Sequence, residues 1–241
     1  MTAPRWSRLA VAVLIAWAVG GVEPPAVQAH EARQLEDEFI KGVFSPSFQA
    51  PPVGTYELPV VKRVAEFVLW DSEGRRVSTQ AVMAGKVAVV SFIYTACSDR
   101  LGCPLASVAL RNLQTRLRGE GLGHKAVLVS ISFDPKRDDA AQLARYARAY
   151  DADPTLWRFL TAPSEPVLER VLDSYGQDRA PVYDERGRFT GRYRHVLKVF
   201  LVDARGDIRN VYSSGFLVPE LVINDIKTVL GAGRPGPAAA R

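Results

Sequence analysis

Apolar runs alternate with amphipathic segments through the middle of the chain. Two short runs rich in β-branched residues, 87–94 and 126–133, have the length and composition of buried strands. The first is followed by a segment with apolar residues at helical spacing, which begins at Pro104 and ends at Gly119. The second is followed by a similar segment that begins at Asp138. The pattern predicts two strand–helix units in succession.

The second half of the chain continues this alternation and then changes it. We expect the remaining elements at 157–160 (strand), 164–176 (helix), 196–202 and 208–212 (hairpin) and 219–230 (helix). Parallel strands that are joined by helices need helices on both faces of their sheet. The order of elements therefore predicts an α/β protein with a thioredoxin-like fold, in which a central mixed β-sheet is flanked by helices on both faces.

The N-terminus has the layout of a secretory signal peptide. Arg5 and Arg8 precede an uncharged apolar stretch, 9–22, and small residues occupy the expected cleavage positions. The apolar stretch is shorter than the roughly 20 residues that cross a bilayer comfortably. We expect cleavage after Ala29. The alternative is an uncleaved anchor, 1–29, that holds the domain at the outer face of the cytoplasmic membrane.

The whole chain then divides into four parts. We expect a signal peptide or anchor at 1–29, a flexible lead-in at 30–55, a thioredoxin-like domain at 56–230 and a disordered tail at 231–241. The export signal predicts a periplasmic or membrane-anchored domain, in a compartment where disulfides form.

Composition narrows the classes of function. The chain has 31 basic and 26 acidic side chains, a net charge of +5, and the two signs are interspersed. Aromatic residues do not recur at the spacing of a nucleic-acid motif, so we set nucleic-acid binding aside. A chain of 241 residues can bury a core without disulfides or structural zinc. Its two cysteines therefore need another explanation.

Both cysteines, Cys97 and Cys103, lie in the loop between the first expected strand and the first long helix. Ligands of α/β sheets bind at such carboxyl ends of strands, and a helix N-terminus stabilises a thiolate. Thiolates select soft metals such as Cu(I), and two are too few for a closed zinc or iron–sulfur site. The pair indicates a copper site with one more ligand, or a redox pair. A structural disulfide is the plain alternative, although so short a loop would stabilise the fold little.

Two histidines and one acidic turn are candidates for further ligands. His195 precedes the hairpin strand expected at 196. In a thioredoxin-like fold this position lies beside the cysteine loop, so His195 is a candidate ligand. The alternative is a histidine that only packs against its neighbours. His30 would become the N-terminal residue after cleavage, where its amine and imidazole can chelate copper. Asp134 and Asp138 follow the second strand, where a carboxylate can cap a helix, support a metal ligand or bind Cu(II).

These residues lie in segments that resemble the Sco/SenC family of copper-binding cytochrome c oxidase assembly proteins. The matching segments, in order along the chain, are 85–86, 91–97, 103–104, 130–135 with Asp138, 143–150, 157–161, His195 with 199–203, and 206–212. The resemblance as a whole covers roughly residues 60–230.

The resemblance implies an exported or membrane-tethered thioredoxin-like protein that helps to assemble the CuA centre of cytochrome c oxidase. It implies that Cys97, Cys103 and His195 bind a copper ion, Cu(I) or Cu(II), and that the partner is the copper-bearing oxidase subunit or another exported copper protein. The loop departs from the family pattern, which has three residues between the cysteines and a proline after each. Here five residues intervene, and Ser98 replaces the first proline, whereas Pro104 is retained.

Functions from different classes remain open. As a copper chaperone, the reduced cysteines would hold Cu(I) with His195 and pass it on by exchange of ligands. As an enzyme, the chain would be a thiol–disulfide oxidoreductase, with Cys97 and Cys103 as attacking and resolving thiols and a thiol reductant to restore them. A third possibility is a copper or redox sensor that acts through a partner. A His195→Ala variant separates the first two, because only the chaperone needs the imidazole.

Overall fold

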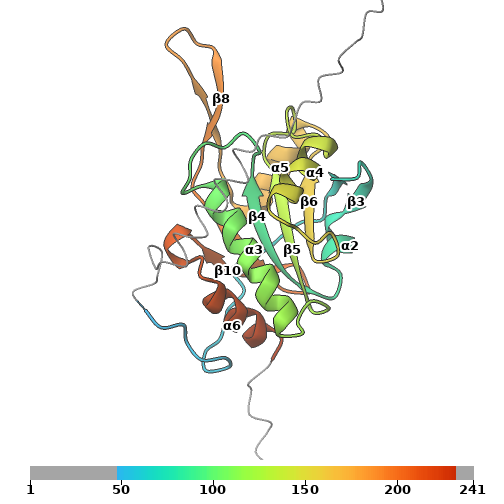
Figure 1. Cartoon of the computed structure of the whole chain (residues 1–241), viewed down its shortest axis with the longest axis vertical. Coiled ribbons are helices and arrows are strands. Elements are labelled where there is room, and N and C mark those ends of the chain that lie inside the picture. Colours follow the sequence, from blue (N-terminus) through green and yellow to red (C-terminus); the bar gives the residue numbers. More distant parts are fainter. Residues whose placement is uncertain (1–47, 232–241) are drawn as a thin grey trace, which may run out of the picture.

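A computed structural model describes residues 48–231 of the chain (Figure 1). The expected signal peptide or anchor and His30 lie outside the described residues. Within residues 48–231, no helix has the length and apolar character needed to cross a membrane.

One eight-stranded mixed sheet forms the centre of the fold. Its strand order is β1-β10-β9-β4-β5-β6-β2-β3. The strands are β1 (Lys62–Arg63), β2 (Val68–Asp71), β3 (Arg76–Ser78), β4 (Val87–Ile93), β5 (Ala126–Ser132), β6 (Trp157–Thr161), β9 (Val199–Val202) and β10 (Asp207–Tyr212). β4, β5 and β6 are parallel, and β9 pairs antiparallel with β4. Every residue of β4, β5 and β9 is buried, which explains their continuous apolar sequences.

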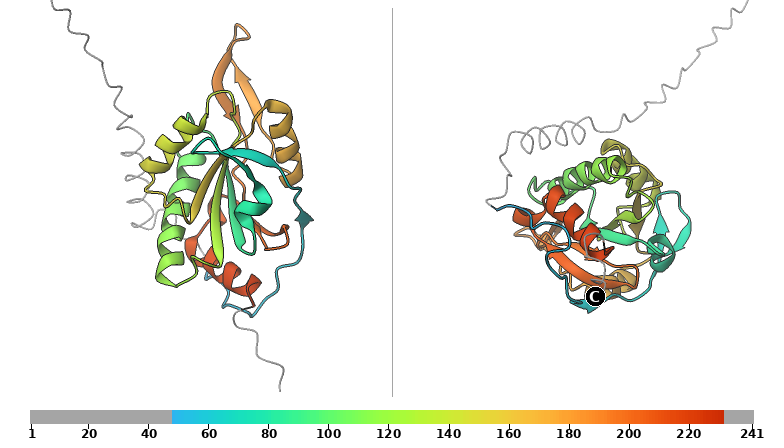
Figure 2. Two further views of the ribbon diagram at one scale, coloured as in Figure 1. Left: turned by 90° about the vertical axis from the view of Figure 1, so that its right-hand side faces the viewer. Right: turned by 90° about the horizontal axis from the view of Figure 1, so that it is seen from below.

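Helices cover both faces of the sheet. They are α2 (Thr79–Met83), α3 (Cys103–Gly119), α4 (Ala140–Ala149), α5 (Glu165–Tyr175) and α6 (Pro219–Val229), with a short 3₁₀ turn at Ser214–Phe216. Figure 2 shows α3, α4 and α6 on one face and α2 and α5 on the other. The predicted α/β architecture, a central mixed sheet with helices on both faces, is confirmed.

A second hairpin, β7 (Ala180–Tyr183) with β8 (Phe189–Arg194), projects from the body of the fold (Figure 1). The sequence pattern did not predict it. The prediction that a strand begins at 196 is wrong, because β9 begins at Val199. The β7–β8 hairpin gives no signal in the sequence pattern because most of its residues are exposed, so neither strand has the apolar run of a core strand.

The lead-in expected over 30–55 is described from Phe48 onward, and these residues lie along α6. The Phe48 ring packs on Phe216, with 5.5 Å between ring centroids. The Gly54 N–H donates to Thr228 Oγ1 at 3.1 Å. Contacts of this kind hold residues 48–55 against the fold.

The buried Asp225 carboxylate of α6 joins this segment to the sheet. It accepts hydrogen bonds from Tyr212 Oη at 2.6 Å, from Asn210 Nδ2 at 2.8 Å and from the Tyr56 hydroxyl. Three donors stabilise the buried charge, which has no cationic partner among them.

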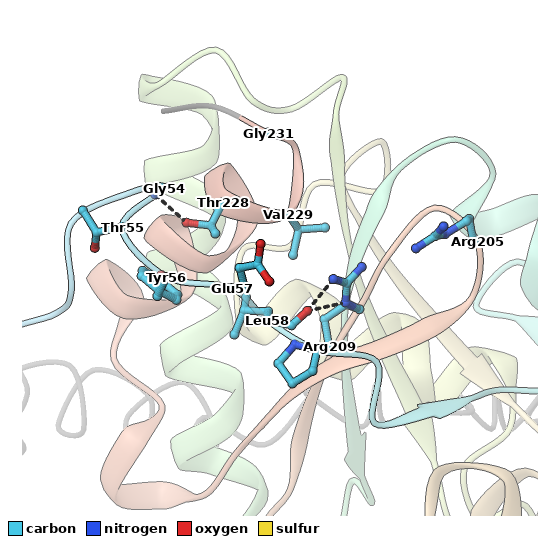
Figure 3. A pocket seen from close by; sticks show the side chains of 11 residues that line it. Gly54, Thr55, Tyr56, Glu57, Leu58, Arg205, Arg209, Thr228, Val229 and Gly231 are labelled. Atoms are coloured by element: carbon cyan, nitrogen blue, oxygen red, sulfur yellow. Dashed lines mark hydrogen bonds between the residues drawn. The ribbon is translucent and has the colours of Figure 1, made fainter. Parts of the chain in front are cut away.

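Beside this network, the 54–59 segment and the C-terminal end of α6 line a hollow of about 500 Å³ (Figure 3). Arg209 crosses it and donates to the Leu58 carbonyl oxygen, at 2.8 Å from Nε, and to Asp203 at 2.9 Å. Its guanidinium therefore already has partners and serves the packing of the segment.

The Tyr56–Asp225 hydrogen bond predicts a particular stability profile. Burial, followed by the contact with Asp225, raises the pKa of Tyr56 from 10.0 to about 12. Because the pKa of Tyr56 is higher in the folded than in the unfolded protein, the protonated hydroxyl contributes to folding stability. This contribution is complete below the unfolded-state pKa and is lost as the pH rises through the folded-state pKa. We expect Tyr56→Phe to lower the free energy of unfolding by about 1–2 kcal/mol at neutral pH. The difference in free energy of unfolding between the parent and Tyr56→Phe should shrink as the pH rises from 10.0 to about 12.

Urea unfolding at several pH values measures this difference. Tyr183→Phe is the matched control, because Tyr183 is exposed on the β7–β8 hairpin and should give no deficit. A Tyr56→Phe deficit that is zero, or that stays constant to high pH, would contradict the assignment.

Candidate metal centre

The structure brings Cys97, Cys103 and His195 together. One potential ligand atom from each lies within 4.8 Å of the others, and Cys103 Sγ is 3.9 Å from His195 Nε2. No other group of three His, Cys, Asp or Glu donors with this proximity occurs among residues 48–231. The three residues that the sequence predicts as ligands therefore form one cluster.

The two cysteines differ in their positions on the fold. Cys103 is the first residue of α3 and is fully buried, whereas Cys97 is partly exposed in the preceding loop. Between them the chain makes a compact turn, in which Asp99 accepts from the Leu101 N–H through its carboxylate and from the Gly102 N–H through its carbonyl, both at 3.0 Å. The longer loop therefore folds on itself and leaves both sulfurs at the end of the sheet.

Asp138 fixes the start of the cysteine loop. Its buried carboxylate accepts from the Thr95 N–H at 3.0 Å, from Thr95 Oγ1 at 2.6 Å and from Ser132 Oγ at 2.6 Å. Burial raises the pKa of Asp138, while these hydrogen bonds oppose the rise. The helix cap proper is the next residue, Asp139, which accepts from the Gln142 N–H. Asp138 therefore ties the end of β4 to the end of β5, directly beside the cysteines.

Asp134 lies outside the ligand cluster. It forms an ion pair with Arg137 and accepts from the Tyr193 hydroxyl at 3.3 Å. Its partners place it at the base of the β7–β8 hairpin, so its contacts support the hairpin that leads to His195.

Aromatic packing holds the His195 imidazole over the cysteine loop. The ring lies against Phe133, with 4.7 Å between centroids, and near Tyr94, at 6.3 Å. Tyr193 packs edge-on against both of these aromatic rings, at 5.5 and 5.7 Å. Because Tyr94 follows β4 and Phe133 follows β5, the aromatic cluster aligns the hairpin with the carboxyl ends of the parallel strands.

Two arginines hold the base of the hairpin. The Arg179 guanidinium lies over the Tyr193 ring, 4.8 Å from its centroid, and donates to the Phe133 carbonyl oxygen. Arg137 donates to the Gly191 carbonyl oxygen and lies 5.3 Å from the centroid of the Phe189 ring. Sequence reasoning missed these positioning residues. The alternation of Phe189, Gly191 and Tyr193 along β8 is the signal that could have revealed the face to which they bind.

The two thiols have opposite acidities. A hydrogen bond from Cys103, with further support from His195 and from the Cys103 N–H, lowers the pKa of Cys97 well below its usual 9.0. Burial, together with the neighbouring Cys97, raises the pKa of Cys103. In the metal-free, reduced site, ionisation is therefore favoured at Cys97 over Cys103.

This donor set fits a soft metal ion. Thiolate and imidazole ligands bind late first-row metals at about 2.0–2.3 Å, so three donors around one ion lie about 3.5–4.0 Å apart. The spacing of 3.9 Å between Cys103 and His195 agrees with that arrangement. Two sulfurs and one imidazole nitrogen suit Cu(I) better than any hard cation.

The cluster is open on one side. Cys97 and His195 line a hollow of about 500 Å³ together with the hairpin residues Val182, Arg192 and Arg194. The partly exposed residue Cys97 therefore lies on the open side of the cluster, whereas the fully buried Cys103 closes the inner side.

Comparison with known proteins identifies sequence relatives. The family model described as SCO1/SenC matches residues 59–231. A SCO1 protein homolog of Bacillus subtilis (strain 168) is 27% identical over 172 residues, which cover 70% of this chain and 84% of the relative.

Solved structures share the fold. A SCO1/SenC family lipoprotein from Bacillus anthracis str. Ames has a TM-score of 0.62 at 22% identity, covering 73% of this chain and 99% of the other. BsSco, described as having a disulfide switch, has a TM-score of 0.58 at 26% identity and covers 71% and 95%. Arabidopsis thaliana ScoI, solved with copper bound, has a TM-score of 0.57 at 24% identity and covers 70% and 98%.

The thiol pair predicts a pH profile for alkylation. In the reduced, metal-free protein, Cys97 should react with iodoacetamide with a midpoint well below 9.0, because Cys103 stabilises its thiolate. Cys103→Ala should move this midpoint upward, since the donor is lost. In Cys97→Ala, the buried Cys103 should react slowly throughout. Mass spectrometry of each labelled cysteine measures the profile, and a parent midpoint at or above 9.0 would contradict it.

A substitution at Gly191 tests whether Arg137 and the hairpin position the His195 ring. Gly191 has φ of +79°, and an added Cβ would lie 2.5 Å from Arg137 Nη1. Gly191→Ala should therefore displace Arg137 and change the NMR shifts of the His195 ring. Gly187→Ala is the matched control, because it has φ of +71° but nothing within 4 Å of its added Cβ. Both variants should have a free energy of unfolding lower by about 1–2 kcal/mol, because alanine is strained in the left-handed backbone conformation. Only Gly191→Ala should move the imidazole signals. Equal imidazole shifts in the two variants would show that Arg137 does not position His195.

Proposed function

This chain belongs to the SCO1/SenC family, and on that premise we propose that it is an exported copper chaperone. Cys97, Cys103 and His195 bind one copper ion, and the protein delivers it during assembly of the CuA centre of cytochrome c oxidase. The single observation that carries the proposal is the convergence of these three donors at the carboxyl end of β4.

Relatives support copper as the cargo. Arabidopsis thaliana ScoI, Bradyrhizobium japonicum ScoI and yeast Sco1 were each solved with copper bound. BsSco is described as a member of the Sco family of cytochrome c oxidase assembly proteins. The donor chemistry of this chain leads to the same ion independently, because two thiolates and one imidazole favour Cu(I).

Delivery outside the cytoplasm rests on the sequence of residues 1–29. Their charged start, apolar middle and small residues at the cleavage positions support export to the periplasm or anchoring at the outer face of the membrane. The description of the Bacillus anthracis relative as a lipoprotein is consistent with this location.

The geometry suggests an order for ligand exchange. An incoming donor reaches the ion from the hollow, on the side of Cys97 and His195, while the buried Cys103 remains behind it. Cys97 can leave as a stabilised thiolate, because its pKa is lowered in the metal-free site. Copper therefore passes to the acceptor without a fully uncoordinated ion.

A thiol–disulfide oxidoreductase is the second candidate, and the asymmetry of the thiols favours it. The accessible Cys97 thiolate would attack a partner's disulfide, and the Cys103 thiol would then lose its proton and resolve the mixed disulfide. The partner disulfide would be reduced to two thiols, and Cys97 and Cys103 would be oxidised to a disulfide. A thiol reductant would restore them.

The chaperone proposal predicts one tightly bound Cu(I) per reduced chain after anaerobic titration and desalting. Cys97→Ser and His195→Ala should each weaken binding by at least about tenfold, equivalent to about 1.4 kcal/mol, because each removes one of three ligands. His124→Ala is the control, since His124 is exposed and outside the cluster. Metal analysis and competition with a Cu(I) chelator give the stoichiometry and affinity.

Undiminished copper affinity in Cys97→Ser or His195→Ala would overturn the chaperone proposal. If the parent holds no copper but catalyses reduction of a model disulfide, and His195→Ala keeps that activity, the oxidoreductase takes its place.

A further inference from the structure

Two arginines of the β7–β8 hairpin border the opening of the metal centre. Arg192 and Arg194 lie on β8 and line the same hollow of about 500 Å³ as Cys97 and His195. We refer to Arg192 and Arg194 as the basic rim. The hollow has a volume typical of binding pockets.

The alternation of side chains along β8 places Arg192 and Arg194 on the same face of the strand. Phe189 and Tyr193 share the strand face that packs on Arg137 and Arg179. The residues that alternate with them along β8 point to the opposite face, because successive side chains of a strand alternate between its two faces. Arg192 and Arg194 therefore share the face of β8 opposite to Phe189, and both line the hollow together with Cys97, Tyr193 and His195.

The charge of the basic rim is not neutralised within the fold. Among residues 48–231, the Arg192 and Arg194 side chains have no ion pair and no hydrogen bond, and both are exposed. Two other arginines of the hairpin region have acidic partners, Arg188 with Asp184 and Arg179 with Glu165.

One carboxylate faces the same hollow, and it does not cancel the two positive charges. Asp99 lines the hollow, but its Oδ1 accepts from the Leu101 N–H and belongs to the turn of the cysteine loop. The lining thus carries two guanidinium groups and one carboxylate. Charges at the rim of a recessed site focus their field on its opening.

We propose that the basic rim docks an acidic protein segment, which brings the accepting donor of that partner to Cys97. The proposal deepens the proposed function, on which it rests, by naming the chemistry of the partner. A protein segment fits better than a lipid surface, because the occupant must enter the hollow to reach the sulfur. A planar bilayer would contact the projecting hairpin and leave the hollow unfilled.

A metal-free experiment tests this proposal separately from copper binding. Two peptides each carry one cysteine as a mixed disulfide with thiopyridine, flanked by several glutamates in one and by glutamines in the other. The Cys97 thiolate attacks the peptide sulfur, a protein–peptide disulfide forms, and thiopyridone is released and measured by absorbance. Each rate is divided by that with neutral dithiodipyridine, which corrects for differences in thiolate fraction.

We expect the parent to react about tenfold faster with the glutamate peptide at low ionic strength, and the preference to fall as salt is added. The Arg192→Glu/Arg194→Glu variant should lose or reverse the preference. Arg186→Glu is the matched control: Arg186 is also exposed on this hairpin without a side-chain partner among the described residues, but it does not line the hollow. It should keep most of the preference.

Equal parent rates with the two peptides would overturn the proposal, as would an equal loss in Arg186→Glu and the double variant. Binding to anionic phospholipid vesicles that the double variant abolishes, without any peptide preference, would reassign the basic rim to a membrane and also overturn it. None of these outcomes depends on copper, so a failure of metal binding and a failure of the basic rim are distinguishable.

Discussion

The His195 imidazole reaches the cysteine loop because its ring packs against Phe133. The contact joins two parts of the chain that the sheet alone would not bring together, since His195 and Cys103 are 92 positions apart. Phe133 also anchors the hairpin, through Arg179 at its carbonyl oxygen and Tyr193 at its ring. The position of the third candidate donor therefore depends on an aromatic and cationic cluster that contains neither Cys97 nor Cys103.

The remaining two donors depend on the sheet and on α3. Asp138 ties the start of the cysteine loop to β5, and α3 begins at Cys103. This placement buries Cys103 fully and leaves Cys97 partly exposed. A hydrogen bond from Cys103 lowers the pKa of Cys97, whereas burial raises the pKa of Cys103. In the proposed function, Cys103 would stay on the inner side of the ion while the outer ligands exchange. The uncompensated charge of Arg192 and Arg194 lies on that outer side.

The sequence predicts the parts of this architecture that depend on burial. Continuous apolar runs identify β4 and β5, and helical spacing with Pro104 and Gly119 identifies α3. Cys97 and Cys103 are evident as a pair because they share one loop at the end of a strand. Their convergence with His195, expected from the resemblance, is a fact of the structure, whereas copper ligation by the three remains a proposal.

Features that depend on side-chain stacking could not be predicted in the same way. The β7–β8 hairpin has little buried surface and is held by Arg137 and Arg179, whose partners lie far away in the sequence. The role of Asp138 also depends on a long-range contact, the one with Thr95, so the local pattern could not distinguish a helix cap from a group that supports or binds a metal ion. Long-range polar contacts of this kind leave no periodic signal.

The coordination shell of the loaded protein is the most direct test of the central claim. X-ray absorption at the copper edge counts the sulfur and nitrogen ligands of an ion bound to the reduced chain. The account predicts two sulfurs and one imidazole nitrogen in the parent, and loss of the imidazole contribution in His195→Ala. A parent spectrum with fewer than two sulfurs, or one that His195→Ala leaves unchanged, would contradict the assignment of Cys97, Cys103 and His195 as a single copper site.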